Sequence, residues 1–153
     1  MTPDYSPARA LLAAARRHPN RLSLVDAAIG DKWSVHEAAD TVARLAAAFD
    51  AVGIGEGTRI AVIGANSPWH YIIHVAASWL GAVTVPLSPR MPSHALASMC
   101  EQAGVSWVFL DEASSAHAST LSGAGAQVAS FADLAAWADR AAPIGRSPAR
   151  CGT

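Results

Sequence analysis

Apolar residues recur at three- and four-residue steps between residues 35 and 52, which is the spacing of one helical face. They are Val35, Ala38, Ala39, Val42, Leu45, Ala46, Phe49 and Val52. Before them, Ser34 and Glu37 have the spacing of a capping box, in which each side chain bonds the other residue's backbone N–H. Gly53 follows as a residue type that commonly ends a helix. The pattern predicts a long amphipathic helix.

Two further elements are predicted upstream of this helix. Residues 7–18 have helical character, with Ser6 as N-cap and a proline at the first helical position. Residues 22–26 and 32–33 flank the turn at residues 29–31, and they predict a β-hairpin.

Short apolar runs alternate with helical segments in the middle of the chain. The runs cover residues 59–63, 82–86 and 106–110, and helices are predicted over residues 66–80 and 92–102. Strands joined by helices of this length form parallel sheets with right-handed crossovers. The predicted fold class is therefore α/β, with an N-terminal hairpin and helix followed by a βαβαβ parallel sheet flanked by helices.

The last third of the chain gives a weaker pattern. Residues 111–126 are rich in Ala, Ser and Gly and predict no definite element. Residues 127–130 favour a short strand, and residues 131–142 favour an amphipathic helix. We expect one domain over residues 1–142 and a loose C-terminal tail over residues 143–153, where no periodicity is visible.

Composition narrows the class of protein. Of the 153 residues, 52% are hydrophobic and 15% charged, and the formal net charge is −1. This balance excludes a disordered chain and the usual basic nucleic-acid binder. The best apolar run, at residues 79–87, is far shorter than the about 18 residues of a membrane span. Asp4 and a short apolar stretch argue against a secretory signal, and the only cysteines are Cys100 and Cys151. We therefore expect a cytoplasmic protein without a nucleic-acid partner or a membrane span.

Two turns are candidates for ligand binding. The glycines of residues 53–57 follow a helix and precede a strand, which is the reverse of a phosphate-binding fingerprint, so they favour a helix end and a turn. The turn at residues 64–68 follows the first parallel strand, where α/β sheets bind ligands. However, Ser67 as N-cap and Pro68 at the first helical position explain that turn without a ligand.

No catalytic constellation emerges from the residue types. His70 and His74 share a helix face and could hold zinc, but with Ser78 they form a polar stripe that favours a solvated or interface edge. Cys100 falls mid-helix with nothing to lower the pKa of its thiol. Asp111 and Glu112 indicate a helix start rather than an acid–base pair. We expect no catalytic, cofactor-binding or metal-ligating residue in this chain.

The order of several motifs resembles the adenylate-forming superfamily of acyl-CoA synthetases, AMP-dependent ligases and luciferases. The motifs are KWSVHE at residues 32–37, AVGIGEGTRIAV at residues 51–62, NSP at residues 66–68, WLGAVTVPLSPR at residues 79–90, and the strand after QAG at residues 102–110. Together they cover about residues 15–111 in consecutive order. Val35, Ala38 and His70 depart from the family pattern in ways that packing tolerates.

The resemblance implies the N-terminal subdomain of an AMP-forming acid–CoA ligase. Complete members use ATP, Mg²⁺ and CoA to convert a fatty acid or another carboxylate into an acyl-adenylate and then a thioester. Their lysine-containing phosphate loop and catalytic lysine have no counterpart here, so we expect this chain alone to be inactive and to bind no cofactor. Whether it counts as an enzyme stays open. Its expected partner is the missing remainder of a ligase or a complete ligase.

Two alternatives remain open at this point. One is a non-catalytic interaction module that docks on a complete ligase or another partner through the polar–aromatic edge around His70, Tyr71 and His74. The other is an independent ligand-binding domain with its site at the turn around Asn66.

Overall fold

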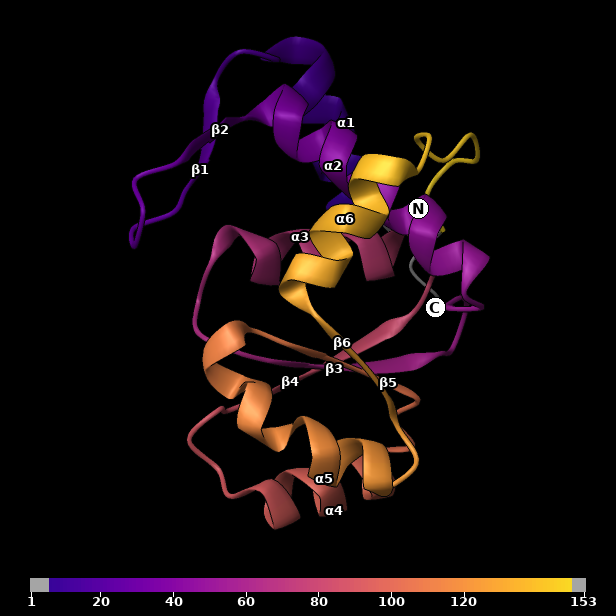
Figure 1. The fold of residues 1–153 in the computed structure, drawn as a ribbon. Helices are drawn as coiled ribbons and strands as arrows, with labels where there is room; N and C mark the ends of the chain where they lie inside the picture. Colours follow the sequence, from indigo (N-terminus) through magenta and orange to yellow (C-terminus); the bar gives the residue numbers. More distant parts are fainter. Residues whose placement is uncertain (1–5, 150–153) are drawn as a thin grey trace.

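The computed structural model describes residues 6–149, which form an α/β fold around a four-stranded parallel sheet (Figure 1). The elements in chain order are α1 (Pro7–Arg17), β1 (Leu22–Val25), β2 (Lys32–Ser34), α2 (Val35–Ala51), β3 (Arg59–Ile63), α3 (Pro68–Trp79), β4 (Val83–Leu87), α4 (Ser93–Ala103), β5 (Trp107–Leu110), the 3₁₀ helix η1 (Glu112–His117), α5 (Ala118–Gly123), β6 (Gln127–Ser130) and α6 (Phe131–Arg140). The predicted α/β class, hairpin and βαβαβ succession are confirmed.

The sheet order is β4-β3-β5-β6, with all neighbours parallel. Helices α1, α2, α3 and α6 cover one face of the sheet, and α4 and α5 cover the other (Figure 1). The connection from β3 to β4 through α3 thus crosses one face of the sheet, and the connection from β4 to β5 through α4 crosses the other. The segments that leave β3 and β5 therefore turn to opposite faces of the sheet. Such a reversal leaves a crevice at the carboxyl ends of these two strands.

Both faces of the central strands β3 and β5 are buried, which explains their continuous apolar runs in the sequence. In β3, Ile60 and Val62 belong to the core under α2 and α3, whereas Ala61 and Ile63 belong to the core under α4 and α5. Between α2 and β5 the rings of two phenylalanines, Phe49 and Phe109, stack with centroids 5.2 Å apart. The α2 helix begins with the predicted capping box, since the Ser34 N–H donates to Glu37 at 2.7 Å and the Glu37 N–H donates to Ser34 at 3.2 Å.

Residues 111–126, for which the sequence predicted no definite element beyond a helix start at Asp111 and Glu112, fold into η1 and α5. Leu121 of α5 is fully buried with the apolar side chains of α4, and Ala126 is buried beside it. Short Ala- and Ser-rich helices of this kind depend on tertiary packing, because they carry little periodic signal of their own.

The hairpin of β1 and β2 extends away from the main sheet (Figure 1). Leu24 and Trp33 pack it against the body, and the Trp33 ring makes an edge-to-face contact with Trp69 of α3 at a centroid distance of 5.9 Å. Several of its apolar side chains remain in solvent: Leu22 is 55%, Val25 48% and Ile29 71% exposed.

The free edge of β4 carries a proline. The Val83 N–H donates to Thr58 on the β3 side, at 2.8 Å. Successive residues of a strand point their N–H groups to opposite sides. The backbone nitrogens of Thr84 and Pro86 therefore face away from β3. Pro86 therefore sits where no neighbouring strand requires its missing N–H.

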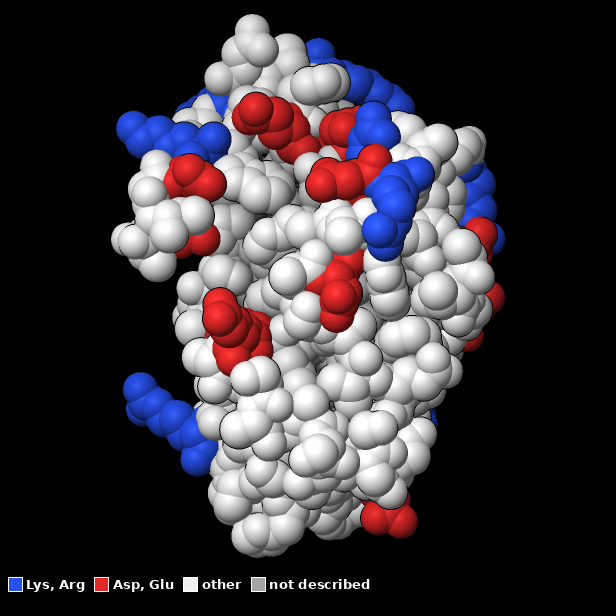
Figure 2. Space-filling view, in the orientation of Figure 1, with Lys and Arg blue, Asp and Glu red and all other residues white. Residues whose placement is uncertain are grey.

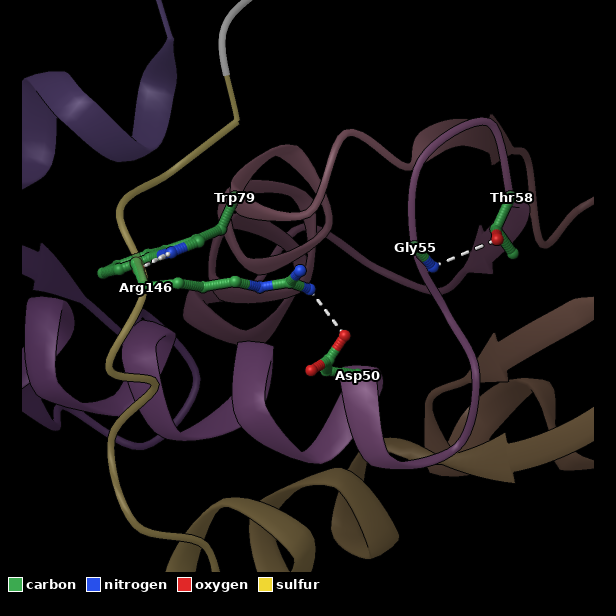
Figure 3. A network of polar contacts seen from close by, with 5 residues as sticks. All are labelled: Asp50, Gly55, Thr58, Trp79 and Arg146. Carbon is green, nitrogen blue, oxygen red and sulfur yellow. Dashed lines mark hydrogen bonds and ion pairs between the residues drawn. The ribbon is translucent and has the colours of Figure 1, made fainter.

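The described part of the expected loose tail is held against the helices. It contains no helix or strand, but the Ile144 N–H donates to Ala43 at 3.1 Å and the Ala149 N–H donates to Trp79 at 2.7 Å. The Trp79 indole N–H donates to the Arg146 carbonyl at 3.0 Å, and the Arg146 guanidinium pairs with Asp50 at 2.5 Å (Figure 3). Sequence periodicity carries no information about such long-range backbone contacts. Residues 150–153 lie outside the described part of the chain.

Candidate functional site

A cavity of about 990 Å³ opens at the carboxyl ends of β3, β5 and β6, beside the hairpin. This is the crevice that the change of face between β3 and β5 produces. The turn at residues 64–68, which the sequence analysis weighed as a candidate ligand position, contributes Ala65 and Ser67 to its wall. The glycines of residues 53–57 lie at the opposite, amino end of β3. There Gly53 and Gly57 have φ values of 82° and 75°, as a helix end and a turn require.

Asp111 joins the ends of the neighbouring strands β3 and β5. Its Oδ2 accepts the Ala65 N–H from the β3 side at 2.8 Å, and its Oδ1 accepts the Ser114 N–H at the start of η1 at 2.9 Å. A Cβ at Gly64 would lie 2.9 Å from the Asp111 Cγ, so this close approach requires glycine. Burial raises the pKa of the Asp111 carboxyl, but the hydrogen bonds from Ser114 and Ala65 outweigh it and hold the pKa below its usual value. The side chain begins a helix, as predicted, and also links two strand ends.

The turn offers few donors to a phosphate. The Ala65 N–H is already taken by Asp111, and Pro68, at the first position of α3, has no N–H. A phosphate site at a helix start depends on such free backbone N–H groups. The Ser67 hydroxyl is buried and has no hydrogen-bond partner among residues 6–149.

Acidic side chains surround the cavity. Asp26 of the hairpin turn, Asp111, Glu112 of η1 and Asp133 of α6 line it, and no lysine or arginine of the described chain does so. Figure 2 shows acidic side chains on both sides of the hollow between the hairpin and the body. Hydrogen bonds from the Ser130 backbone and hydroxyl hold the pKa of the Asp133 carboxyl below its ordinary value. The cavity therefore has a negative wall at neutral pH.

The two histidines of α3 have different surroundings. The His70 ring is tilted against Phe131 of α6 at a centroid distance of 6.2 Å, and burial lowers the pKa of its imidazole. His74 Nδ1 instead lies 2.5 Å from the Thr84 hydroxyl of β4. Between residues 6 and 149, no group of three or more His, Cys, Asp or Glu residues has the arrangement of a metal site.

A serine–histidine pair that the sequence analysis missed lies on the other face of the sheet. Ser93 at the start of α4 is 2.7 Å from His117 Nδ1, and His117 Nε2 is 3.3 Å from the Pro89 carbonyl. The pair joins α4 to η1, and neither side chain lines the acidic cavity. Cys100 of α4 is buried, and burial raises the pKa of its thiol, as expected for an unreactive core residue.

Comparison with known proteins identifies the family. The family model described as AMP-binding enzyme matches residues 11–144. The chain belongs to the AMP-binding enzyme family. Its resemblance to the adenylate-forming superfamily is thereby confirmed.

Two curated relatives of this AMP-binding family member come from Arabidopsis thaliana. A probable peroxisomal acyl-activating enzyme 12 is 28% identical over 105 residues, and a peroxisomal benzoate–CoA ligase is 28% identical over 106 residues. Each alignment covers 69% of this chain and 18% of the relative. The chain thus spans less than one fifth of the length of these relatives.

Solved structures show the same fold. The N-terminal domain of FACL13 from Mycobacterium tuberculosis has a TM-score of 0.88 at 21% identity, with 97% of this chain and 39% of that chain covered. The N-terminal subdomain of Klebsiella oxytoca NpsA, in complex with 3-hydroxyanthranilyl-AMSN, has a TM-score of 0.78 at 22% identity, with 94% and 34% covered. This AMP-binding family chain therefore has the fold of the first part of such domains. No helix within residues 6–149 is both long and apolar enough to cross a membrane.

Proposed function

We propose that the chain is the N-terminal part of an AMP-forming acyl-CoA ligase that activates a fatty acid or another carboxylate in the cytoplasm, and that it does not catalyse adenylation alone. The family match over residues 11–144 supports the first half of this proposal. The acyl-activating and benzoate–CoA ligase names of the curated relatives support the substrate class. ATP, Mg²⁺ and CoA are assigned to the complete enzyme, whose remainder is the expected partner.

The composition of the cavity wall supports the second half of the proposal, that this chain does not catalyse adenylation alone. Adenylation requires cationic groups and backbone N–H donors around the triphosphate, where charge develops in the transition state. Four carboxylates line this cavity, and the described chain places no basic side chain among them. Because like charges repel, such a wall disfavours a polyanion. The residues present do not fit a phosphate cradle, so the groups that hold ATP must come from the rest of the ligase.

Carboxylate-dependent exchange of pyrophosphate into ATP tests this proposal. We expect no exchange from the purified 153-residue chain with a panel of aromatic and aliphatic carboxylates. We expect exchange when a separately expressed remainder of a homologous ligase is added, if the chain supplies the scaffold of a split enzyme. Exchange by the chain alone, above a mock-purified control, would overturn the claim of inactivity.

The second candidate is a non-catalytic module that docks on a complete ligase. The exposed apolar side chains of the hairpin favour it, together with Tyr71, which is 38% exposed beside His74. Sedimentation of the chain with a purified complete ligase is the test. A stable complex that is lost on Tyr71→Ala would support docking, and two independent sedimenting species would exclude it for that ligase.

A further inference from the structure

The acidic cavity has the dimensions of a small-molecule site. Its volume of about 990 Å³ is at the upper end of the roughly 300–1,000 Å³ that ligand cavities occupy. It lies between the hairpin turn, the ends of three parallel strands and the start of α6, so separate parts of the chain build its wall.

Much of the wall is apolar. Trp69 of α3, Leu110 of β5, Val128 of β6 and Phe131 of α6 contribute hydrocarbon or aromatic surface. Trp69 is also held by its edge-to-face contact with Trp33, which fixes the ring at the side of the cavity. An alkyl or aryl group would remove this surface from water, which is favourable in proportion to the area buried.

The charges on the wall have one sign. Asp111 and Asp133 are held by hydrogen bonds to backbone N–H groups, so their carboxylates are fixed in place. The Asp26 carboxylate accepts the Ala28 N–H at 2.9 Å, and Glu112 is exposed. No described lysine or arginine forms an ion pair with any of the four. The negative potential of the cavity is therefore not neutralised by the part of the chain that the structure describes.

We propose that this cavity binds an organic cation, an alkyl- or arylammonium compound whose apolar body lies against the Trp69 and Phe131 side of the wall and whose ammonium group lies among the carboxylates. This ligand class goes beyond the proposed ligase function, because the substrates of adenylation are anions. The apolar surface supplies affinity for any hydrophobic body of suitable size, and the carboxylates select the cation. Binding should accordingly weaken as salt screens the exposed charges.

Three ligands that share one apolar body separate the contribution of the apolar surface from that of the carboxylates. 4-Phenylbutylamine, 4-phenylbutanol and 4-phenylbutyrate share the same aryl chain and differ in the charge of the head group. Calorimetric titration of the full 153-residue chain at pH 7 and low salt should rank amine, alcohol and carboxylate in falling affinity. We expect the amine to bind at least about tenfold more tightly than the alcohol, because an ammonium group among carboxylates in a partly solvated wall gains a few kcal/mol at most.

Variants of the chain test whether the preference for the amine arises in the cavity. The double variant Asp26→Asn with Glu112→Gln removes two of the four charges, those that neither begin α6 nor join the strand ends, and should reduce the preference for the amine while leaving alcohol binding unchanged. The pair Glu101→Gln with Asp139→Asn changes the net charge equally on exposed helix positions outside the wall and should preserve the preference. Ala132→Trp, at an exposed position of the wall, should fill the cavity and weaken both ligands.

Several outcomes would overturn the proposal. A wild-type chain that shows no saturable amine binding, or that binds the amine and the carboxylate equally, would refute it. Equal losses from the cavity pair and the control pair would show that only the net charge matters, and unchanged amine binding in Ala132→Trp would place the ligand elsewhere. None of these results depends on ligase activity, so the binding proposal and the ligase proposal can fail independently.

Discussion

Replacement of Asp111 by alanine tests how the two strand ends are held at the carboxyl edge of the sheet. The Ala65 N–H loses its acceptor, and the Ser114 N–H keeps only its 3.1 Å bond to the Asp111 backbone carbonyl. Loss of a helix N-cap costs about 1 kcal/mol, and loss of a bond from the Ala65 N–H to a charged acceptor costs about 1.5 kcal/mol. We therefore expect Asp111→Ala to lower the free energy of unfolding by about 2–3 kcal/mol. For a chain of this size the melting temperature should fall by ~5–10 °C.

Urea denaturation followed by circular dichroism measures this loss, with Glu112→Ala as the matched control. Glu112 is the adjacent, exposed carboxylate, and its removal should cost less than about 0.5 kcal/mol. Equal stability losses in the two variants would refute the assigned role of Asp111, because the effect would then reflect charge rather than the two hydrogen bonds.

The pH dependence gives an independent check on the same residue. The pKa of the Asp111 carboxyl is lowered in the folded chain, so the folded state binds its proton less readily than the unfolded state does. Its contribution is fully present above the unfolded pKa, near 4, and is lost as the pH falls through the lower folded pKa. The stability difference between the wild-type chain and Asp111→Asn should therefore shrink below about pH 4. A difference that is constant from pH 7 to pH 3 would contradict the hydrogen-bond explanation.

Three other measurements follow from the structure. Phe49→Ala removes a fully buried ring that stacks on Phe109 and should cost about 3–5 kcal/mol in urea denaturation, whereas Val52→Ala, at a 40%-exposed site, should cost far less. Trp79→Phe removes the indole donor to the Arg146 carbonyl, so amide hydrogen exchange in the segment after α6 should become faster while exchange in the sheet is unchanged. Excess Zn²⁺ should leave the melting temperature unchanged, since the two α3 histidines have separate surroundings; a rise would indicate a shared site.

Much of the fold could be predicted because its signals are local. The Ser34 and Glu37 pair marks the start of α2, and the alternation of apolar runs with helical periods predicts the parallel strands. The residues of β6 match the predicted strand in full. η1 and α5 could not be predicted, because alanine, serine and glycine are compatible with several conformations until Leu121 packs against α4.

The acidic cavity was only partly predictable. The position of the turn at residues 64–68 beside a strand end indicated where a ligand could lie. Asp26 and Asp133 belong to the hairpin turn and the start of α6, more than one hundred residues apart, and each has a local role as a turn or capping residue. Their shared location depends on tertiary packing, so no motif in the sequence identifies them as parts of one wall.

The proline at the edge of β4 has a consequence for the behaviour of the chain at high concentration. A sheet that ends in an unprotected strand can add the same strand of another molecule and grow into aggregates. Along β4 only Thr84 directs an N–H outward, since Pro86 has none, and an isolated donor cannot support a ladder of hydrogen bonds. The backbone of β4 itself therefore disfavours extension of the sheet at this edge. Although the chain is rich in apolar residues, it can expose β4 without pairing this strand with the β4 of another copy.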